Sequence, residues 1–425
     1  MNEDFIQYLW KFRLLKKDLF TIDHKPLEVI DPGIINTNGG PDISVCKIRI
    51  EDTIWVGNAE IHTSSSDWFK HKHNIDAAYD NLILHIVFNH DSQCIVRENE
   101  EVIPTLEIAG KFELEMWDRY QYLSKSRKWI PCSGMIEKVK PSVWIGFYDR
   151  LLAERLERKA NDIIRMYERT NHDWDETFYI MLASGFGVKV NKVPFELLTK
   201  SIPIRVIQRH KDNLLQLEAL LYGQANLLPE NPKDAYTKTL VREYRFLSHK
   251  YGLQALPKGL WNFLRMRPSN FPSLRLSQLA NILFHSGNVF SLVRECKSIK
   301  DLYKLLEVKA STYWDKHYVF EKESHFKVKV LGHSAIDLII INTIVPFLFI
   351  YGKHKLNSNL QERALSFLEQ LQFEKNSITR KFISHGICPK SAFESQALIE
   401  LKNSYCRYKK CLNCRIGNHL LRSDI

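Results

Sequence analysis

Two carboxylates and a histidine stand close together in the N-terminal part of the sequence. Asp42 ends the turn GGPD at residues 39–42, and Glu60 and His62 lie in GNAEIH at residues 57–62. Two carboxylates a few ångströms apart repel one another unless a cation lies between them, and oxygen ligands suit Mg²⁺ or Mn²⁺. Such an ion can polarise a phosphodiester and activate a bound water. We predict a divalent-metal site at Asp42 and Glu60, with His62 as a catalytic group that orients or deprotonates the water.

A β-hairpin must position these residues. Segments 43–50 and 53–62 are rich in β-branched residues, which is typical of strands, and two or three residues join them. A three-residue loop places Asp42 and Glu60 on one face of the sheet. A two-residue loop separates them unless a β-bulge, for example at Gly57, restores the alternation. The apolar pattern favours the three-residue loop.

Three more histidines and a lysine follow the hairpin. Lys72, between His71 and His73 in FKHKH, could hold a scissile phosphate, and His85 lies in an apolar strand. Because residues two apart cannot share a helix face, we expect at most one of His71 and His73 to point inward, and a lone buried His85 fits a core residue. A five-ligand zinc or manganese site is the less favoured alternative, with Glu60, His62, His71, His73 and His85 as ligands.

The pattern of Asp42 at the start of one strand and Glu60-x-His62 on the next resembles the signature of PD-(D/E)xK nucleases. The predicted order of helix, strand hairpin, helix and strand also fits that fold. The resemblance implies a mixed sheet with flanking helices and Mg²⁺-dependent cleavage of DNA or RNA. That family usually has lysine at the position of His62, and Lys72 could replace it.

The chain as a whole is similar to an uncharacterised bacterial family, a domain of unknown function. The similarity lies in GGPD, GNAEIHTSSSDWFKHKH, YDNLILHIV, RMRPSNFPSLRL and the cysteine tail.

The C-terminal tail contains four of the eight cysteines in the spacing C-x17-C-x4-C-x2-C. They are Cys388, Cys406, Cys411 and Cys414. Four thiolates suit either structural Zn²⁺ or a [4Fe–4S] cluster, and reduced structural thiols are the alternative. A predicted helix at residues 391–404 separates the first cysteine from the rest. Cys388 must therefore fold back past the start of this helix for all four thiols to meet.

A basic and aromatic stretch suggests contact with nucleic acid. Lysine and arginine outnumber aspartate and glutamate 60 to 49, a net charge of +11 that suits a polyanion. Arg265, Arg267 and Arg275 stand among aromatic residues, and guanidinium groups with aromatic rings bind phosphates and bases. Lys410 adds positive charge to the tail. The alternative is that the aromatic residues are core and the arginines pair with glutamates.

Composition and hydrophobic periodicity change along the chain and predict three parts. Residues 1–130 form an α/β domain, residues 136–385 a mostly α-helical domain, and residues 386–425 a small Cys-rich module. The apolar run 338–352 is broken by Asn342 and Pro346 and is too short for a membrane span, so we expect a buried, kinked helix and no membrane partner. The N-terminus lacks the pattern of a secretion signal, and free cysteines favour the cytoplasm.

These features together predict a metal-dependent nuclease that hydrolyses phosphodiester bonds in DNA or RNA. One alternative is a non-catalytic nucleic-acid-binding protein on a degenerate nuclease fold, and another is a metal-stabilised scaffold. The sequence leaves the oligomeric state open.

Overall fold

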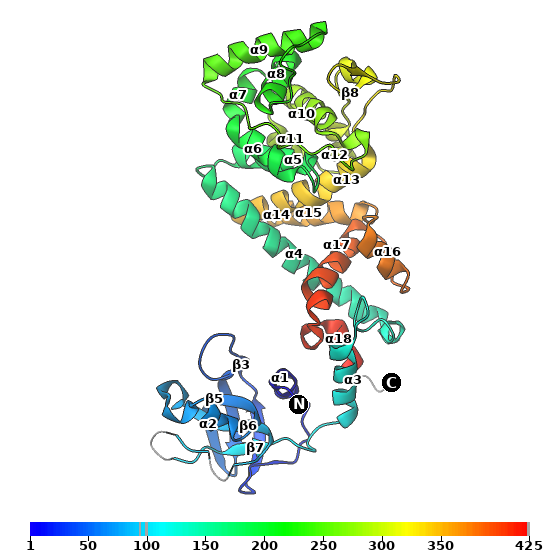
Figure 1. Ribbon diagram of the computed structural model, residues 1–425. Helices are drawn as coiled ribbons and strands as arrows, with labels where there is room; N and C mark the ends of the chain where they lie inside the picture. Colours follow the sequence, from blue (N-terminus) through cyan, green and yellow to red (C-terminus); the bar gives the residue numbers. More distant parts are fainter. Residues whose placement is uncertain (93–94, 98–100, 423–425) are drawn as a thin grey trace. The chain divides into compact units, whose positions relative to one another are not determined.

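The chain forms two units in the computed structural model, which describes residues 1–92, 95–97 and 101–422 (Figure 1). The first unit, here called the sheet unit, combines Met1–Ile145 with Lys402–Ile425, and the second, the helical unit, comprises Gly146–Leu401. A mixed sheet, a mostly helical region and C-terminal cysteines are present as predicted. The boundaries differ from the predicted ones, because the tail packs with the sheet unit.

The sheet unit contains one seven-stranded mixed sheet with the order β1-β2-β4-β5-β6-β7, and β3 pairs with β4. Strand β4 is antiparallel to β2 and to β5, whereas β6 runs parallel to β5 and β7 parallel to β6. The strands are β1 (Leu19–Phe20), β2 (Pro26–Asp31), β3 (Ile34–Ile35), β4 (Ile43–Ile50), β5 (Thr53–Ser64), β6 (Leu82–Asn89) and β7 (Thr105–Glu107).

Helix α1 (Glu3–Lys11) packs against one face of this sheet. Its buried side chains, among them Phe5 and Leu9, join Ile48 of β4 and Ile61 of β5 in one apolar core. Burial of large side chains of this kind contributes about 2 kcal/mol each. The crossover from β5 to β6 contains only the short helix α2 (Asp67–Lys70) and two 3₁₀ turns. Two further helices complete the unit, α3 (Leu114–Lys125) and α18 (Arg415–Arg422).

The β4–β5 hairpin has a two-residue turn, so the predicted three-residue loop is wrong. Ile50 pairs with Thr53, and the apolar side chains Ile54 and Val56, on which the prediction rested, are exposed. The register shifts by one residue between Ile43 and Cys46 of β4, so the compensating β-bulge lies in β4 and not at Gly57.

The extra residue of this bulge is accommodated by Val45. Its φ is +53°, and its backbone N–H donates a hydrogen bond to Oδ1 of Asn58 at 3.3 Å. A β-branched residue rarely adopts this left-handed conformation, because Cβ approaches the following carbonyl.

We expect Val45→Gly to stabilise the hairpin by about 1 kcal/mol, since glycine adopts positive φ without this strain. Val56→Gly is the matched control: Val56 is similarly exposed, 61% against 64%, but its φ is not positive, so glycine there should destabilise β5. Hydrogen–deuterium exchange of β4 and β5 at increasing urea measures both effects. Equal destabilisation by the two substitutions would contradict the strain at Val45.

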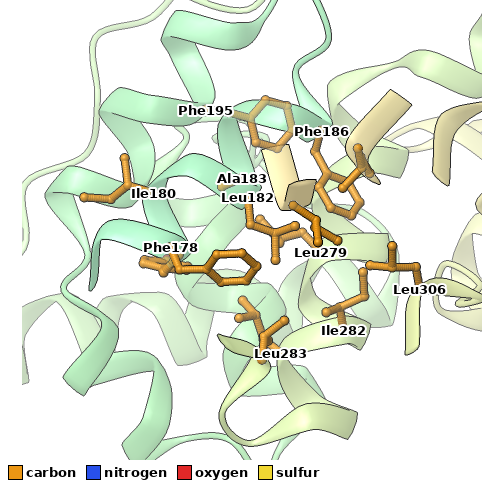
Figure 2. Close-up of a cluster of buried hydrophobic side chains, with 14 of the residues drawn as sticks. Phe178, Ile180, Leu182, Ala183, Phe186, Phe195, Leu279, Ile282, Leu283 and Leu306 are labelled. Carbon is orange, nitrogen blue, oxygen red and sulfur yellow. The ribbon is translucent and has the colours of Figure 1, made fainter. Parts of the chain in front are cut away.

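The helical unit contains one large apolar core. Side chains of α5 and α10, such as Phe178, Leu182 and Leu283, gather in one cluster (Figure 2). Helix α4 (Pro141–Arg169) begins in the sheet unit and continues into this one. The other helices are α5 (Trp174–Phe186), α6 (Lys192–Ser201), α7 (Ile204–Arg209), α8 (Leu214–Gln224), α9 (Ala235–Tyr251), α10 (Pro272–Ser286), α11 (Val289–Glu295), α12 (Ile299–Leu306), α13 (His333–Ile339), α14 (Val345–His354), α15 (Ser358–Gln370), α16 (Ser377–Ile383) and α17 (Ala392–Glu400). A two-stranded sheet of β8 (His317–Val319) and β9 (Lys322–Glu323) completes the unit.

The apolar run predicted as a buried, kinked helix belongs to this core. Among the described residues, the segment His333–His354 is the one helix long and apolar enough to cross a membrane by length and composition, and two thirds of its apolar window is buried in the protein. A π-helical turn at Ile340–Ile344 interrupts it just before Pro346. The side chain of Asn342 accepts a hydrogen bond from Nη2 of Arg155 at 3.0 Å.

Candidate metal centre

Strand β5 places Glu60 and His62 on the sheet face opposite α1. Ala59 and Ile61, which alternate with them, enter the core beneath α1. Glu60 and His62 are almost completely buried, at 6% and 1% exposure. In the parallel pairing with β6, Glu60 lies beside His85.

His62 is hydrogen-bonded through both ring nitrogens. Its Nδ1 lies 2.8 Å from Nε2 of the fully buried His85, and its Nε2 lies 3.1 Å from Nδ1 of His71. Burial lowers the pKa of His62 and of His85 to about 3, so both rings are neutral at physiological pH. His85 holds the orientation of His62, as outer-shell partners of metal-binding histidines do.

A reversal of the chain brings His71 and His73 to the same side. Helix α2 ends at Lys70, Lys72 adopts the left-handed conformation with φ +62°, and His73 begins a 3₁₀ turn. The two histidines therefore do not share one helix, and both rings approach that of His62 although His71 is exposed. One ligand atom from each of His62, His71 and His73 lies within 4.8 Å of the other two.

Glu60 lies beside two of these three histidines. Its Oε1 lies 3.8 Å from Nε2 of His62 and 3.5 Å from Nε2 of His73. A tetrahedral metal with bonds of 2.0–2.2 Å holds its ligand atoms roughly 3.4 Å apart. The structure thus brings together three of the five residues in the less favoured zinc or manganese alternative, with Glu60 beside two of them and His85 behind His62.

Asp42 and Glu60 hold each other through the backbone. The N–H of Asp42 donates to Oε2 of Glu60 at 2.9 Å, and the N–H of Ile61 donates to Oδ2 of Asp42 at 3.2 Å. Gln7 of α1 donates from Nε2 to Oδ1 of Asp42 at 3.1 Å. Glu3 of α1 is half-buried and interacts electrostatically with Asp42.

Gln7 was not foreseen from the sequence. Its position one helical turn after Glu3, on the side of α1 away from Phe5 and Leu9, is the signal that could have identified it.

Aromatic side chains lie on the buried side of the histidine–carboxylate group. The rings of Trp68 and Tyr79 lie 5.4 Å and 4.0 Å from that of His73, measured between ring centroids, and Trp68 also contacts His85. Trp68 is fully buried and donates from Nε1 to the carbonyl of Val96 at 3.1 Å. These side chains exclude water from one side of the carboxylate.

The burial of Glu60 has an electrostatic consequence. Burial first, and the charge of Asp42 second, raise the pKa of Glu60 to about 8. Burial likewise raises the pKa of Asp42. Glu60 therefore carries a proton at neutral pH unless a cation takes the place of that proton.

Without metal, we expect the stability of the wild-type protein to fall between pH 6.5 and 8. Unfolded Glu60 is ionised throughout this range, whereas folded Glu60 keeps its proton until about pH 8, so the folded state binds more protons and loses stability as the pH rises. The folded rings of His62 and His85, with pKa near 3, are neutral here. Unfolded histidines take up protons toward about pH 6.5 and offset part of the decline at the low end of the range, equally in wild type and Glu60→Gln. Glu60→Gln should remove up to about 2 kcal/mol of this decline.

The measurement is urea unfolding in EDTA at several pH values. Glu28→Gln on β2 is the control, because the Glu28 side chain is 61% exposed and should leave the pH dependence as it is. Parallel curves for wild type and Glu60→Gln would show that burial does not shift the pKa of Glu60.

The donors indicate which metal the group prefers. Three imidazoles and one carboxylate suit Zn²⁺, Mn²⁺ or Fe²⁺, whereas Mg²⁺ prefers oxygen ligands and water. Of the two ions expected from the sequence, the nitrogen donors therefore favour Mn²⁺ over Mg²⁺.

Four other predicted residues are exposed. Lys72 is exposed at the tip of the turn between the two histidines. Arg265 and Arg267 are exposed in the helical unit, and Lys410 is exposed in the tail. Their predicted contacts with nucleic acid remain predictions.

Arg275 requires a correction, because only 5% of it is exposed. Its Nη1 donates to Oε1 of Gln278 at 3.1 Å and its Nη2 to Oδ1 of Asn270 at 2.6 Å. This guanidinium pairs with amides in the interior and cannot reach a nucleic acid. Trp261, from the same stretch, is a core residue that donates from Nε1 to the carbonyl of Ala225.

The predicted cysteine set also differs from the structure. Cys388 is exposed and belongs to the helical unit, whereas Cys406, Cys411 and Cys414 belong to the sheet unit. Helix α17 and the π-helical turn that follows it separate Cys388 from the other three along the chain, which is the separation that the predicted helix had implied. Cys132, which the sequence did not single out, lies in the sheet unit.

The fold and the donor group define an α/β unit with a candidate metal centre, continued by a helical unit. A scan against protein families matches residues 3–377 to DUF2851, described as a protein of unknown function. The chain belongs to this family, which confirms the predicted membership of an uncharacterised family over nearly the whole chain. Searches of curated proteins and of solved structures found no match, and no comparison indicates a likeness to PD-(D/E)xK nucleases.

Proposed function

We propose that this protein is a divalent-metal-dependent hydrolase that cleaves phosphodiester bonds in DNA or RNA. The observation that carries the proposal is the convergence of His62, His71 and His73 beside the buried carboxylate of Glu60. Imidazole nitrogens beside a buried carboxylate, which can exchange its proton for a cation, make a ligand set that suits a metal.

The exposure of the ligands favours a catalytic over a structural centre. His62 and Glu60 are buried, but His71 is exposed and His73 half-buried. One side of the group thus opens to solvent, and catalytic metal sites differ from structural ones in keeping such an open position. Asp42, half-buried beside Glu60, can accept a proton or contact a second ligand on this side.

The roles of the chain's own residues follow from these positions. Glu60, His62, His71 and His73 would hold the ion, which when bound supplies Lewis-acid polarisation of a phosphoryl oxygen and a lowered pKa for water. His85 fixes the ring of His62, and Gln7 fixes the carboxylate of Asp42. Lys72, on the exposed tip, is free to approach a phosphate.

Two features support phosphodiesters as the substrate class. The net charge of +11 attracts polyanions. The antiparallel β4–β5 hairpin followed by a crossover to the parallel β6, with carboxylates at the hairpin, keeps the strand order that the nuclease hypothesis requires.

Cleavage of nucleic acid tests the proposal directly. We expect Mn²⁺- or Zn²⁺-dependent cleavage of DNA or RNA, reduced at least about 100-fold in Glu60→Gln and His71→Ala, because removal of a metal ligand weakens the site more than loss of an outer partner does. His325→Ala, an exposed histidine of the helical unit, is the control. Gel assays with labelled strands at fixed salt measure the rates.

The alternatives give different results in the same experiments. A non-catalytic binding protein would retain salt-sensitive affinity for nucleic acid in all variants and cleave with none. A metal-stabilised scaffold would bind no nucleic acid even at low salt. Cleavage that persists in Glu60→Gln would remove this site from the reaction.

Metal affinity should depend on pH in a defined direction. Because burial raises the pKa of Glu60 to about 8 while the histidines His62 and His85 are already neutral, metal binding must displace the Glu60 proton. We expect the affinity for Mn²⁺ to rise by up to about tenfold per pH unit below pH 8 and then to level off. Calorimetry in buffers of different ionisation enthalpy counts the released protons. In Glu60→Gln the affinity should be lower and the rise absent.

A further inference from the structure

Cys132 lies in the same core as the tail cysteines, although 273 residues separate it from Cys406 in the sequence. It follows α3 in the chain and packs, half-buried, against the core cluster that contains Cys411. Leu412, next to Cys411, packs against the same cluster. Two distant parts of the chain therefore place thiols in one apolar environment.

Hydrogen bonds hold the tail against the segment that contains Cys132. Nζ of Lys402 donates to the carbonyl of Trp129 at 2.5 Å and lies 4.7 Å from the centroid of the Trp129 ring. Nζ of Lys409 donates to the carbonyl of Ser124 at 2.8 Å. Helix α18 lies beside α3 (Figure 1). The tail is thus fixed on both sides of its cysteines.

The tail is folded into tight turns along the stretch that carries its three thiols. Cys406 and Cys411 each begin a 3₁₀ turn, and Lys409 between them has φ +52°. The N–H of Cys414 donates to the carbonyl of Cys411 at 3.3 Å. Gly417 of α18 approaches so closely that a Cβ there would lie 2.2 Å from the carbonyl oxygen of Cys411. A side chain at this position would displace the turn.

The thiols also lie within electrostatic range of one another. Burial first, and then Cys414 and Cys411, raise the pKa of Cys132 to about 12. Burial, followed by Cys414, Cys132 and Cys411, raises the pKa of Cys406, and burial and Cys414 raise that of Cys411 to about 12. Cys406 thus interacts with the other three thiols, and Cys132 with Cys411 and Cys414. None of the four is in a disulfide. A metal ion deprotonates the thiols that coordinate it, so reduced thiols gathered in one core are candidate ligands.

We propose that Cys132, Cys406, Cys411 and Cys414 form a four-thiolate metal centre, in which Cys132 takes the place expected for Cys388. The ligands suit one tetrahedral Zn²⁺ or one [4Fe–4S] cluster, which share the requirement for four thiolates. The centre uses none of the residues of the histidine–carboxylate site, so it stands whether or not that site hydrolyses phosphodiesters. Its role is to fasten the tail to the sheet unit.

Metal analysis of the full-length protein, purified without oxygen, tests the proposal. A zinc centre gives colourless protein with bound zinc, and a cluster gives brown protein with iron and acid-labile sulfide. We expect Cys132→Ser to lose this metal and Cys388→Ser to keep it. Cys296→Ser, a buried thiol of the helical unit, is the control for loss of a core cysteine. Loss in Cys388→Ser with retention in Cys132→Ser would overturn the proposal, as would retention in both.

A second measurement covers the case in which Cys132→Ser folds poorly. After chelation, Co²⁺ is added to the folded fraction of each protein, and thiolate-to-cobalt charge transfer is recorded; imidazole and carboxylate ligands give no such band, so the histidine site does not contribute. We expect the band of Cys132→Ser to fall by about a quarter, as one of four thiolates is lost, and that of Cys388→Ser and His71→Ala to equal wild type. Equal bands for wild type and Cys132→Ser, or no band in wild type, would overturn the proposal.

Discussion

The β-bulge in β4 is the constraint on which the candidate metal centre depends. The turn between β4 and β5 has two residues, and in an undisturbed hairpin of this register Ile43 would lie opposite Glu60. The extra residue at the bulge moves Ile43 opposite Ala59, so that Asp42 meets Glu60 instead. Ile43 then enters the core beneath α1, and the carboxylate of Asp42 stays on the side of the histidines. The left-handed conformation of Val45 is the local cost of this arrangement.

The second constraint is the burial of a carboxylate among neutral rings. Glu60 accepts a hydrogen bond from the backbone of Asp42, and Trp68 and Tyr79 close the inner side of the site. An unpaired charge in such a place is costly, and neutral His62 offers no positive partner. A proton relieves the cost at neutral pH and a divalent cation relieves it better, since the cation also satisfies the imidazole lone pairs. The same burial that destabilises the metal-free protein therefore favours metal binding.

The sequence predicted the strands of the hairpin, the mixed sheet and the helical region, because alternating and helical patterns are local. It predicted Asp42, Glu60 and His62 as neighbours, but on the basis of the wrong hairpin register. That register assumed that Ile54 and Val56 are core residues, and both are exposed. The left-handed conformation of Lys72 brings His71 and His73 to one side. The spacing of apolar residues in the sequence does not predict this conformation. Such details depend on tertiary contacts and not on local preference.

The position of Cys132 is the clearest case of information that spacing cannot supply. The sheet unit consists of two chain segments, separated in the sequence by Gly146–Leu401. The C-terminal tail therefore joins the first segment only after this long intervening stretch. The entropic cost of closing so long a loop rises by only about 0.6 kcal/mol for each doubling of its length. A ligand from residue 132 therefore costs scarcely more entropy than a ligand that is nearby in sequence. A metal centre that includes Cys132 links the two segments of the sheet unit, whereas a centre made from Cys388 to Cys414 would not. Sequence spacing alone favours Cys388 as the fourth ligand. Cys132 is favoured instead because it restrains the two segments of the folded sheet unit.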